Sequence, residues 1–308
     1  MPPFIAKIPN RCQFIKMEKV TVAIFGGLGN QLFQYAMGRA LSLRTRRSLE
    51  LDLRFYEHRK AFDFGLNHFN IQATIGTPDS LPPARTNRLR YFYWRYLSAR
   101  NTFIREGNKR RAGENLQTKD NIYLHGYWQS ENHFLDSIAQ IRCDLSPVQP
   151  PTKQHKEILL RVNSCNSVAI HVRRGDYVSN PKAKKIYAEC PNRYYKRAIR
   201  MIEEKTNKST KPFIFSDDPE WAADNLNLGV NSEIVSTDPP SLPSQELWTM
   251  ANCMHQVIAN STFSWWAAWL NKNPEKIVVA PKQWMRSRTS SELGLIPNGW
   301  LVVDNCIA

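Results

Sequence analysis

Apolar residues in this chain form short runs that alternate with stretches of helical spacing. Residues 20–25 read V-T-V-A-I-F, residues 31–43 carry apolar side chains at helical spacing, and leucines at positions 49, 51 and 53 alternate as in a strand. Glycines at 26, 27 and 29 separate the first two segments. This order predicts a strand, a glycine-rich turn, a helix and a second strand.

The second half repeats this alternation more regularly. Strands are predicted at residues 168–172, 213–215, 256–258 and 277–280, and helices at 194–204, 220–226, 247–253 and 265–270. Strands separated by helices predict right-handed βαβ units and a parallel sheet covered on both faces.

A proline-rich stretch divides the two halves. Residues 146–151 read S-P-V-Q-P-P and cannot continue a helix or a central strand. We therefore expect an N-terminal extension at residues 1–16, a first Rossmann-like domain at 17–150 and a second at 151–308. A ligand is expected in the cleft between the two domains.

Composition changes this picture mainly through charge. The 308 residues include 42 Lys and Arg against 27 Asp and Glu, a net charge of +15, while 42% hydrophobic residues exclude a disordered chain. No apolar run approaches the ~20 residues of a membrane span. Prolines and a lysine interrupt the first twelve residues, where a signal peptide needs an unbroken apolar stretch. We therefore expect a cytoplasmic protein.

About half of the excess charge lies in residues 85–119, which hold ten basic and two acidic residues. Leu89, Phe92, Tyr93, Tyr96 and Leu97 in this segment follow helical spacing and are expected to pack inward. The basic residues suggest peripheral contact with an anionic membrane, at the inner membrane face. Nucleic-acid binding is the alternative that the same aromatic and basic composition leaves open.

The glycine-rich turn is the first of four segments that follow predicted strands. Its sequence, G-G-L-G-N-Q at 26–31, allows a backbone to approach a ligand closely. It is neither the G-x-G-x-x-G dinucleotide fingerprint nor a Walker loop. A binding loop and a plain tight turn both remain open.

The second segment reads H-V-R-R-G-D-Y at 171–177. Adjacent side chains diverge, so one arginine can reach into a cleft while the other pairs with an acid. A guanidinium binds phosphate oxygens in a bidentate manner. Ligand binding and a structural salt bridge both fit this pattern, and His171 by itself also fits a core histidine.

The other two segments resemble helix starts. F-I-F-S-D-D-P at 213–219 suits a helix N-cap, and N-S-T-F-S at 260–264 precedes an apolar helix whose N-terminus could bind a phosphate. The tryptophans at 265, 266 and 269 are expected to pack in the core. No D-x-D pair occurs, which argues against a nucleotide sugar held through a divalent metal.

Together these segments resemble a known family. G-G-L-G-N-Q-L-F-Q-Y-A, H-V-R-R-G-D-Y, F-S-D-D and N-S-T-F-S-W-W-A-A-W-L-N, in this order, resemble the α-1,2-fucosyltransferases of glycosyltransferase family eleven. Y-W-Q-S-E at 127–131 and A-P-K-Q-W at 280–284 extend the resemblance to residues 20–300. The H-x-R-R-x-D motif alone is shared more loosely with α-1,6- and protein O-fucosyltransferases.

The resemblance implies an α/β protein of the GT-B type, with two Rossmann-like domains facing a central cleft. It implies an acceptor-side first domain and a second domain that binds GDP-β-L-fucose. The implied reaction inverts the donor to give an α-1,2-fucoside on a terminal galactose of an oligosaccharide or lipid-linked glycan. It requires no cofactor and no metal.

The resemblance also implies roles for individual residues. Arg173 would bind the departing pyrophosphate, His171 and Asp217 would hold the nucleoside, and Asn30 would close the site from the first domain. The helix N-terminus against the phosphates would be formed by Ser261, Thr262, Phe263 and Ser264.

The catalytic base is the least defined role. Asp176 is the carboxylate nearest to the arginines, and it can serve either as the base or to orient Arg173 or Arg174. Related α-1,6 enzymes place a glutamate five residues further on, where this chain has Pro181. Glu131 is the second candidate. A fucosyltransferase of another linkage or acceptor, and a non-catalytic sugar-binding protein, are further alternatives.

Overall fold

The computed structural model of the protein describes residues 18–58, 62–84, 86–99, 102–107, 121–175, 180–229 and 231–306. The expected extension at 1–16 and the candidate base Asp176 lie outside these ranges.

The first unit is built on a parallel sheet of five strands. Its strand order is β3-β2-β1-β5-β4, and every pair is parallel. The strands are β1 (Lys19–Ala23), β2 (Ser48–Asp52), β3 (Thr74–Ile75), β4 (Phe103–Arg105) and β5 (Ile122–His125). The helices are α1 (Leu28–Thr45), α2 (Arg54–His58), α3 (Arg88–Tyr93) and α4 (Ile138–Asp144), with short helical turns η1 (Leu66–His68), η2 (Trp94–Ser98), η3 (Glu131–His133) and η4 (Leu135–Ser137).

The second unit is built on a parallel sheet of six strands in the order β13-β10-β9-β6-β7-β8. The strands are β6 (Ser167–Val172), β7 (Lys211–Ser216), β8 (Glu233–Ile234), β9 (His255–Val257), β10 (Val278–Pro281) and β13 (Leu301–Val303), with an antiparallel pair β11 (Gln283–Met285) and β12 (Arg288–Thr289). The helices are α5 (Lys153–Asn163), α7 (Pro181–Ile186), α8 (Asn192–Thr206), α9 (Pro219–Asn225), α10 (Pro243–Ala251) and α11 (Thr262–Leu270).

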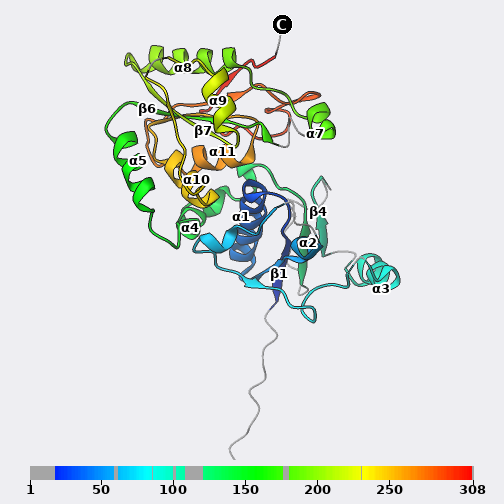
Figure 1. Ribbon diagram of the computed structural model, residues 1–308. Helices are drawn as coiled ribbons and strands as arrows, with labels where there is room; N and C mark the ends of the chain where they lie inside the picture. Colours follow the sequence, from blue (N-terminus) through cyan, green and yellow to red (C-terminus); the bar gives the residue numbers. More distant parts are fainter. Residues whose placement is uncertain are drawn as a thin grey trace, which may run out of the picture.

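The two units meet where α1 packs on α11, between the two sheets (Figure 1). Phe33 of α1 lies 4.5 Å from Trp265 and 4.9 Å from Trp266, measured between ring centroids. Phe134 stacks on Trp266 at 5.6 Å. Because these rings are buried, residues of both units share one hydrophobic core.

The strands and helices predicted from the apolar pattern are confirmed. All four strands and all four helices predicted in the second half are present, as are β1, α1 and β2. The tryptophans of α11 are buried as expected. The α/β class with two Rossmann-like units is likewise confirmed. The proposed boundary at residue 150 falls between α4 and α5.

One boundary differs from the prediction at the glycine-rich turn. Helix α1 begins at Leu28, so Gly29 and Asn30 belong to its first turn rather than to the loop before it. Only Gly26 needs a conformation with positive φ, at 81°. Gly29 has a different reason to be glycine, described below.

The prediction that the aromatic stripe of residues 85–119 packs inward is wrong. Its five members are between 54% and 84% exposed. Helical spacing shows that side chains share a face, but it does not show what covers that face.

Within the described ranges, no helix is both long and apolar enough to cross a bilayer.

Candidate functional site

The predicted site residues of the second unit that the structure describes lie at the carboxyl ends of β6, β7 and β9. Strands β6 and β9 are neighbours at the centre of the six-stranded sheet, and the chain continues outward from β6 to β7 and β8 on one side and from β9 to β10 on the other. Open α/β sheets bind ligands at such a topological switch point. Arg173 follows β6 directly, and Ser261 follows β9 shortly before α11.

Arg173 is held by Asp217, which follows β7. The guanidinium Nη1 lies 2.6 Å from the Asp217 carboxylate. The other carboxylate oxygen accepts a hydrogen bond from the Arg174 N–H at 2.8 Å. A Cβ on Gly175 would lie 2.5 Å from this carboxylate, so only glycine allows the close approach. Asp217 therefore fixes both the backbone and the side chain of the arginine segment.

Arg174 forms a separate set of contacts, with Asp218 and Trp221. Its Nε lies 3.2 Å from the carboxylate of Asp218, and its guanidinium lies 3.6 Å from the ring centre of Trp221. Asp218 also caps α9 by accepting from the Trp221 N–H, which confirms the predicted N-cap. Both arginines thus pair with acids, whereas the sequence suggested that only one would.

His171 is the penultimate residue of β6 and is buried. Burial, with a contribution from Arg173, lowers its pKa to about 3, so the ring is neutral at physiological pH. Its Nδ1 has no hydrogen-bond partner among the described residues. Its ring centre lies 5.7 Å from that of Phe263 in α11. A buried nitrogen without a partner fits a residue that awaits a ligand.

The N-terminus of α11 lies beside His171. Ser261 is the N-cap, and its hydroxyl accepts a hydrogen bond from the Phe263 N–H at 3.3 Å. Ser264 is fully buried, and its hydroxyl donates to the Ser261 carbonyl. The first-turn N–H groups of a helix lack intrahelical acceptors and carry partial positive charge. Ser264 is buried as a whole, and the half-buried residues of this helix start are Thr262 and Phe263.

Asn30 contacts this helix start from the first unit. Its Oδ1 accepts from the Thr262 hydroxyl at 3.2 Å and from the Gln129 side-chain amide at 2.8 Å. A Cβ on Gly29 would lie 2.5 Å from the backbone of Thr262 and Phe263. Glycine at this position is what allows the N-termini of α1 and α11 to meet.

Sequence reasoning missed Glu106, which shapes the loop that carries Gln129. Its carboxylate accepts from the N–H groups of Tyr127 and Trp128 at 2.6 and 2.8 Å. Trp128 has φ of 58°, an uncommon conformation for a bulky residue, and it is buried. The two bonds stabilise this strained turn, and no motif in the sequence marks the glutamate.

Sequence reasoning also missed Glu246, in the first turn of α10. Burial raises the pKa of its carboxyl to about 7, the nearby Asp217 carboxylate adds to this shift, and Arg173 opposes it. The structure therefore brings a second acidic group within electrostatic range of the Arg173 and Asp217 pair. It lies 29 residues from Asp217 in sequence, with no spacing signal.

Glu131 lies at the other end of α11. Its carboxylate accepts from the indole N–H of Trp269 at 3.2 Å. Trp269 is seven residues beyond Thr262, which corresponds to about 10 Å along a helix. Glu131 therefore contacts the C-terminal half of α11, while Gln129, two residues before it, bonds to Asn30, which contacts the N-terminus of the same helix.

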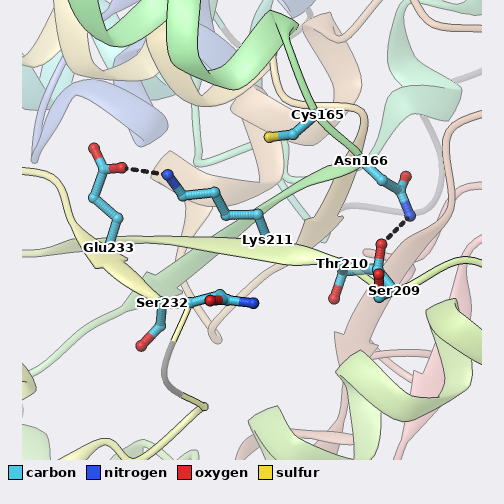
Figure 2. Close-up of a pocket in the computed structure, with 8 residues that line it drawn as sticks. Cys165, Asn166, Ser209, Thr210, Lys211, Ser232 and Glu233 are labelled. Carbon is cyan, nitrogen blue, oxygen red and sulfur yellow. Dashed lines mark hydrogen bonds and ion pairs between the residues drawn. The ribbon is translucent and has the colours of Figure 1, made fainter.

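A cavity of about 590 Å³ lies at the opposite edge of the second sheet, at the amino ends of its strands (Figure 2). Lys211, the first residue of β7, pairs there with Glu233 at 2.9 Å. The lining residues are Cys165, Asn166, Ser209, Thr210, Lys211, Asn231, Ser232 and Glu233. None of them belongs to the motifs above, and α/β proteins place their ligands at the carboxyl ends of strands.

Two Rossmann-like units that meet at the N-termini of two helices have the architecture of the GT-B class of glycosyltransferases. The chain belongs to Glycosyl transferase family 11, whose family model matches residues 6–303.

Two bacterial relatives align with nearly the whole chain. The α-1,2-colitosyltransferase of Escherichia coli is 33% identical over 294 residues, covering 94% of this chain and 100% of the relative. The O-antigen biosynthesis glycosyltransferase WbnK of Escherichia coli is 31% identical over 301 residues, covering 90% of this chain and 97% of the relative. Among solved structures, the fucosyltransferase NodZ from Bradyrhizobium is 14% identical with a TM-score of 0.48, covering 82% of this chain and 92% of that chain.

Proposed function

We propose that the protein transfers L-fucose from GDP-β-L-fucose to the 2-hydroxyl of a terminal β-galactoside, with inversion to an α-1,2-linkage and without a metal. The observation that carries this proposal is the position of Arg173. The Asp217 carboxylate holds it at the carboxyl end of β6, beside β9, whose chain leads into α11, and His171 two residues earlier contacts Phe263 of that helix. Membership of family 11 supplies the reaction class.

The proposed reaction is a single displacement. The acceptor 2-hydroxyl oxygen attacks C1 of fucose from the face opposite GDP, the bond between C1 and the phosphate oxygen breaks, and its electron pair leaves with GDP. Negative charge therefore grows on the pyrophosphate in the transition state. Arg173 and the N–H groups at the start of α11 stabilise that charge more than they stabilise the ground state.

In the proposed complex, the nucleoside end of GDP binds the polar groups that lie near the arginine. Guanine presents N–H donors on one edge, which a carboxylate accepts well. Glu246 provides such a carboxylate, and the unpartnered Nδ1 of His171 provides a further polar contact. Asp217 acts mainly by positioning Arg173, since both of its oxygens are engaged by the arginine segment.

Asp176 is the proposed base that takes the proton of the acceptor hydroxyl. It directly follows Gly175, which packs against Asp217. Proton transfer by a positioned carboxylate typically contributes ~10² to 10⁴ in rate.

GDP-colitose is a second candidate donor, because a relative at 33% identity is an α-1,2-colitosyltransferase. Colitose is the 3-deoxy form of fucose, so the two donors differ by one hydroxyl. A pocket that bonds the fucose 3-hydroxyl would strongly disfavour the analogue that lacks it. Rates with both donors and one β-galactoside acceptor, together with NMR assignment of the product linkage, distinguish these functions. Transfer from neither donor would contradict both.

Replacing Arg173 tests the proposed role directly. We expect Arg173→Ala to reduce transfer by ~10²- to 10³-fold, the typical loss for one charge-stabilising donor. Circular dichroism should remain that of the folded wild type. Arg161→Ala is a matched control, because Arg161 pairs with Glu233 beside the opposite edge of the sheet, and its rate should not change. Near wild-type transfer in Arg173→Ala would contradict the assignment.

Metal independence is tested by chelation. Because the proposed charge neutralisation comes from arginine and helix termini, we expect an excess of EDTA to leave the transfer rate unchanged. Restoration of a lost rate by Mn²⁺ or Mg²⁺ after chelation would refute this part of the proposal.

A further inference from the structure

The helical segment Arg88–Ser98, formed by α3 and η2, exposes a continuous apolar face. Its large hydrophobic side chains are Leu89, Phe92, Tyr93, Tyr96 and Leu97, with exposed fractions of 84%, 60%, 62%, 54% and 64%. Their spacing of three and four residues places them on one side of the helix. Few soluble surfaces leave five such residues together without a partner.

The opposite side of the same segment is attached to the protein. Trp94 packs edge-on against Phe103 at 5.7 Å and against Tyr123 at 5.5 Å, measured between ring centroids. These two residues belong to β4 and β5 at the edge of the first sheet. The segment is thus held by Trp94 and turns its apolar face outward. Figure 1 shows α3 at the periphery of the first unit, away from the contact between the two units.

Arginines border the apolar face. Arg88 and Arg90 are exposed, and neither forms an ion pair within the described part of the chain. Arg95 lies over the ring of Phe103 at 4.0 Å. The segment contains no acidic residue, and residues 85–119 carry a net charge of +8. An apolar face bordered by cations is the pattern of a helix that lies in a membrane interface.

We propose that α3 and η2 dock this protein on an anionic lipid bilayer, with the five apolar side chains inserted among the acyl chains and the arginines at the headgroups. Leu89 and Leu97 distinguish this surface from a nucleic-acid platform, because leucine inserts into lipid but does not stack on bases. A second copy of the chain would place two strongly basic faces against each other. An anionic bilayer satisfies both the apolar side chains and the arginines.

Vesicle flotation of the full-length protein tests the docking surface. The vesicles are pure phosphatidylcholine or phosphatidylcholine with phosphatidylglycerol, each at low and high salt. We expect binding to the anionic vesicles only, and weaker binding at high salt. The variant Leu89→Ser with Phe92→Ser should bind on the order of 10- to 100-fold more weakly, because two inserted side chains are lost. Arg88→Glu with Arg90→Glu should also weaken binding.

The matched control is Ile75→Ser with Leu160→Ser, which removes two exposed apolar side chains elsewhere and should bind like the wild type. All variants should keep the wild-type transfer rate on a water-soluble acceptor. A variant that fails to fold would lose this rate and is thereby distinguished from one that only loses membrane binding. Equal binding to neutral and anionic vesicles, or unchanged binding of Leu89→Ser with Phe92→Ser, would overturn the proposal. Two other results would also overturn it: a dimer seen in analytical ultracentrifugation, or an RNA or DNA complex formed at physiological salt, if Leu89→Ser with Phe92→Ser abolishes that dimer or complex.

Discussion

At the scale of single residues, Asp217 organises the candidate site. One of its oxygens binds the Arg173 guanidinium and the other binds the Arg174 N–H, while Gly175 leaves room for the carboxylate. A guanidinium that is already bonded to a carboxylate is held in one orientation, so it loses less conformational entropy when it binds a phosphate. The arrangement therefore pre-organises Arg173 before any ligand arrives.

Glu246 supports a prediction on pH. Its folded pKa of about 7 lies above the ordinary value of 4.5, so the folded protein holds an extra proton between these values. This group's contribution to stability is therefore fully present below about pH 4.5 and is lost as pH rises through 7. We expect Glu246→Gln to remove this decline. Between pH 5 and pH 8, the unfolding temperature of the wild type should therefore fall more than that of the variant. Thermal unfolding at the two pH values measures the difference, and an equal decline in both proteins would contradict it.

The same substitution separates stability from binding. If the carboxylate accepts from guanine, wild-type affinity for GDP should rise as pH passes through about 7, because only the ionised form accepts two bonds. Glu246→Gln should flatten this profile in calorimetric titration with GDP. A pH-independent wild-type affinity would remove Glu246 from the proposed nucleotide site.

Sequence could identify His171, Arg173 and the α11 cap, because each lies at or shortly after the end of a strongly apolar strand, where ligand residues are expected. Sequence could not identify Glu106 or Glu246, because only the folded chain brings these two residues near the site and no motif marks them. Nor could it show that Asp217 pairs with Arg173, since their 44-residue separation becomes a contact only when β6 and β7 align in register.

At the scale of elements, the contact between α1 and α11 determines how closely the two units meet. Gly29 has no side chain where the backbone of Thr262 and Phe263 passes, and Asn30 accepts a hydrogen bond from the Thr262 hydroxyl. The sequence predicted the helices, but it assigned Gly29 to a turn. A glycine required by a neighbour cannot be distinguished from a turn glycine until the neighbour is known.

Gly29→Ala tests this contact. The added Cβ would lie 2.5 Å from backbone atoms that cannot move without shifting α11, so we expect loss of stability and at least a tenfold fall in transfer rate. Gly27→Ala is the comparison, because its Cβ would meet only the Phe62 ring at 3.5 Å, an ordinary contact. Similar unfolding temperatures and rates for the two variants would argue against a tight junction between the helices.

At the scale of the whole molecule, the two units share aromatic packing. Phe33 and Phe134 of the first unit contact Trp265 and Trp266 of the second, and all four belong to one buried cluster. Arg142 adds a polar link, since its guanidinium donates to the Trp269 carbonyl and lies 4.6 Å from the ring centre of that residue. The two sheets could each be the centre of a separate domain, but here the two units depend on one shared core for their stability.

This coupling predicts cooperative unfolding. Because removing either unit would expose the shared rings to water, we expect a single transition in differential scanning calorimetry, with equal calorimetric and van't Hoff enthalpies. Phe33→Ala should lower the midpoint and cost about 3 to 5 kcal/mol, as is usual for a buried phenylalanine. Two resolved transitions in the wild type would show that the units unfold independently.

The shared rings also bear on how relatives of this protein can be recombined. The proline-rich linker near residue 150 would mark the simplest point at which to exchange first units between family members, if the two units were independent modules. Here such a chimera would join two half-cores that were shaped by different partners, and the mismatch would fall on α11, whose N-terminus belongs to the candidate site. A recombinant that retains the phenylalanines at 33 and 134 with their own α11 preserves the packing on which the position of the helix depends.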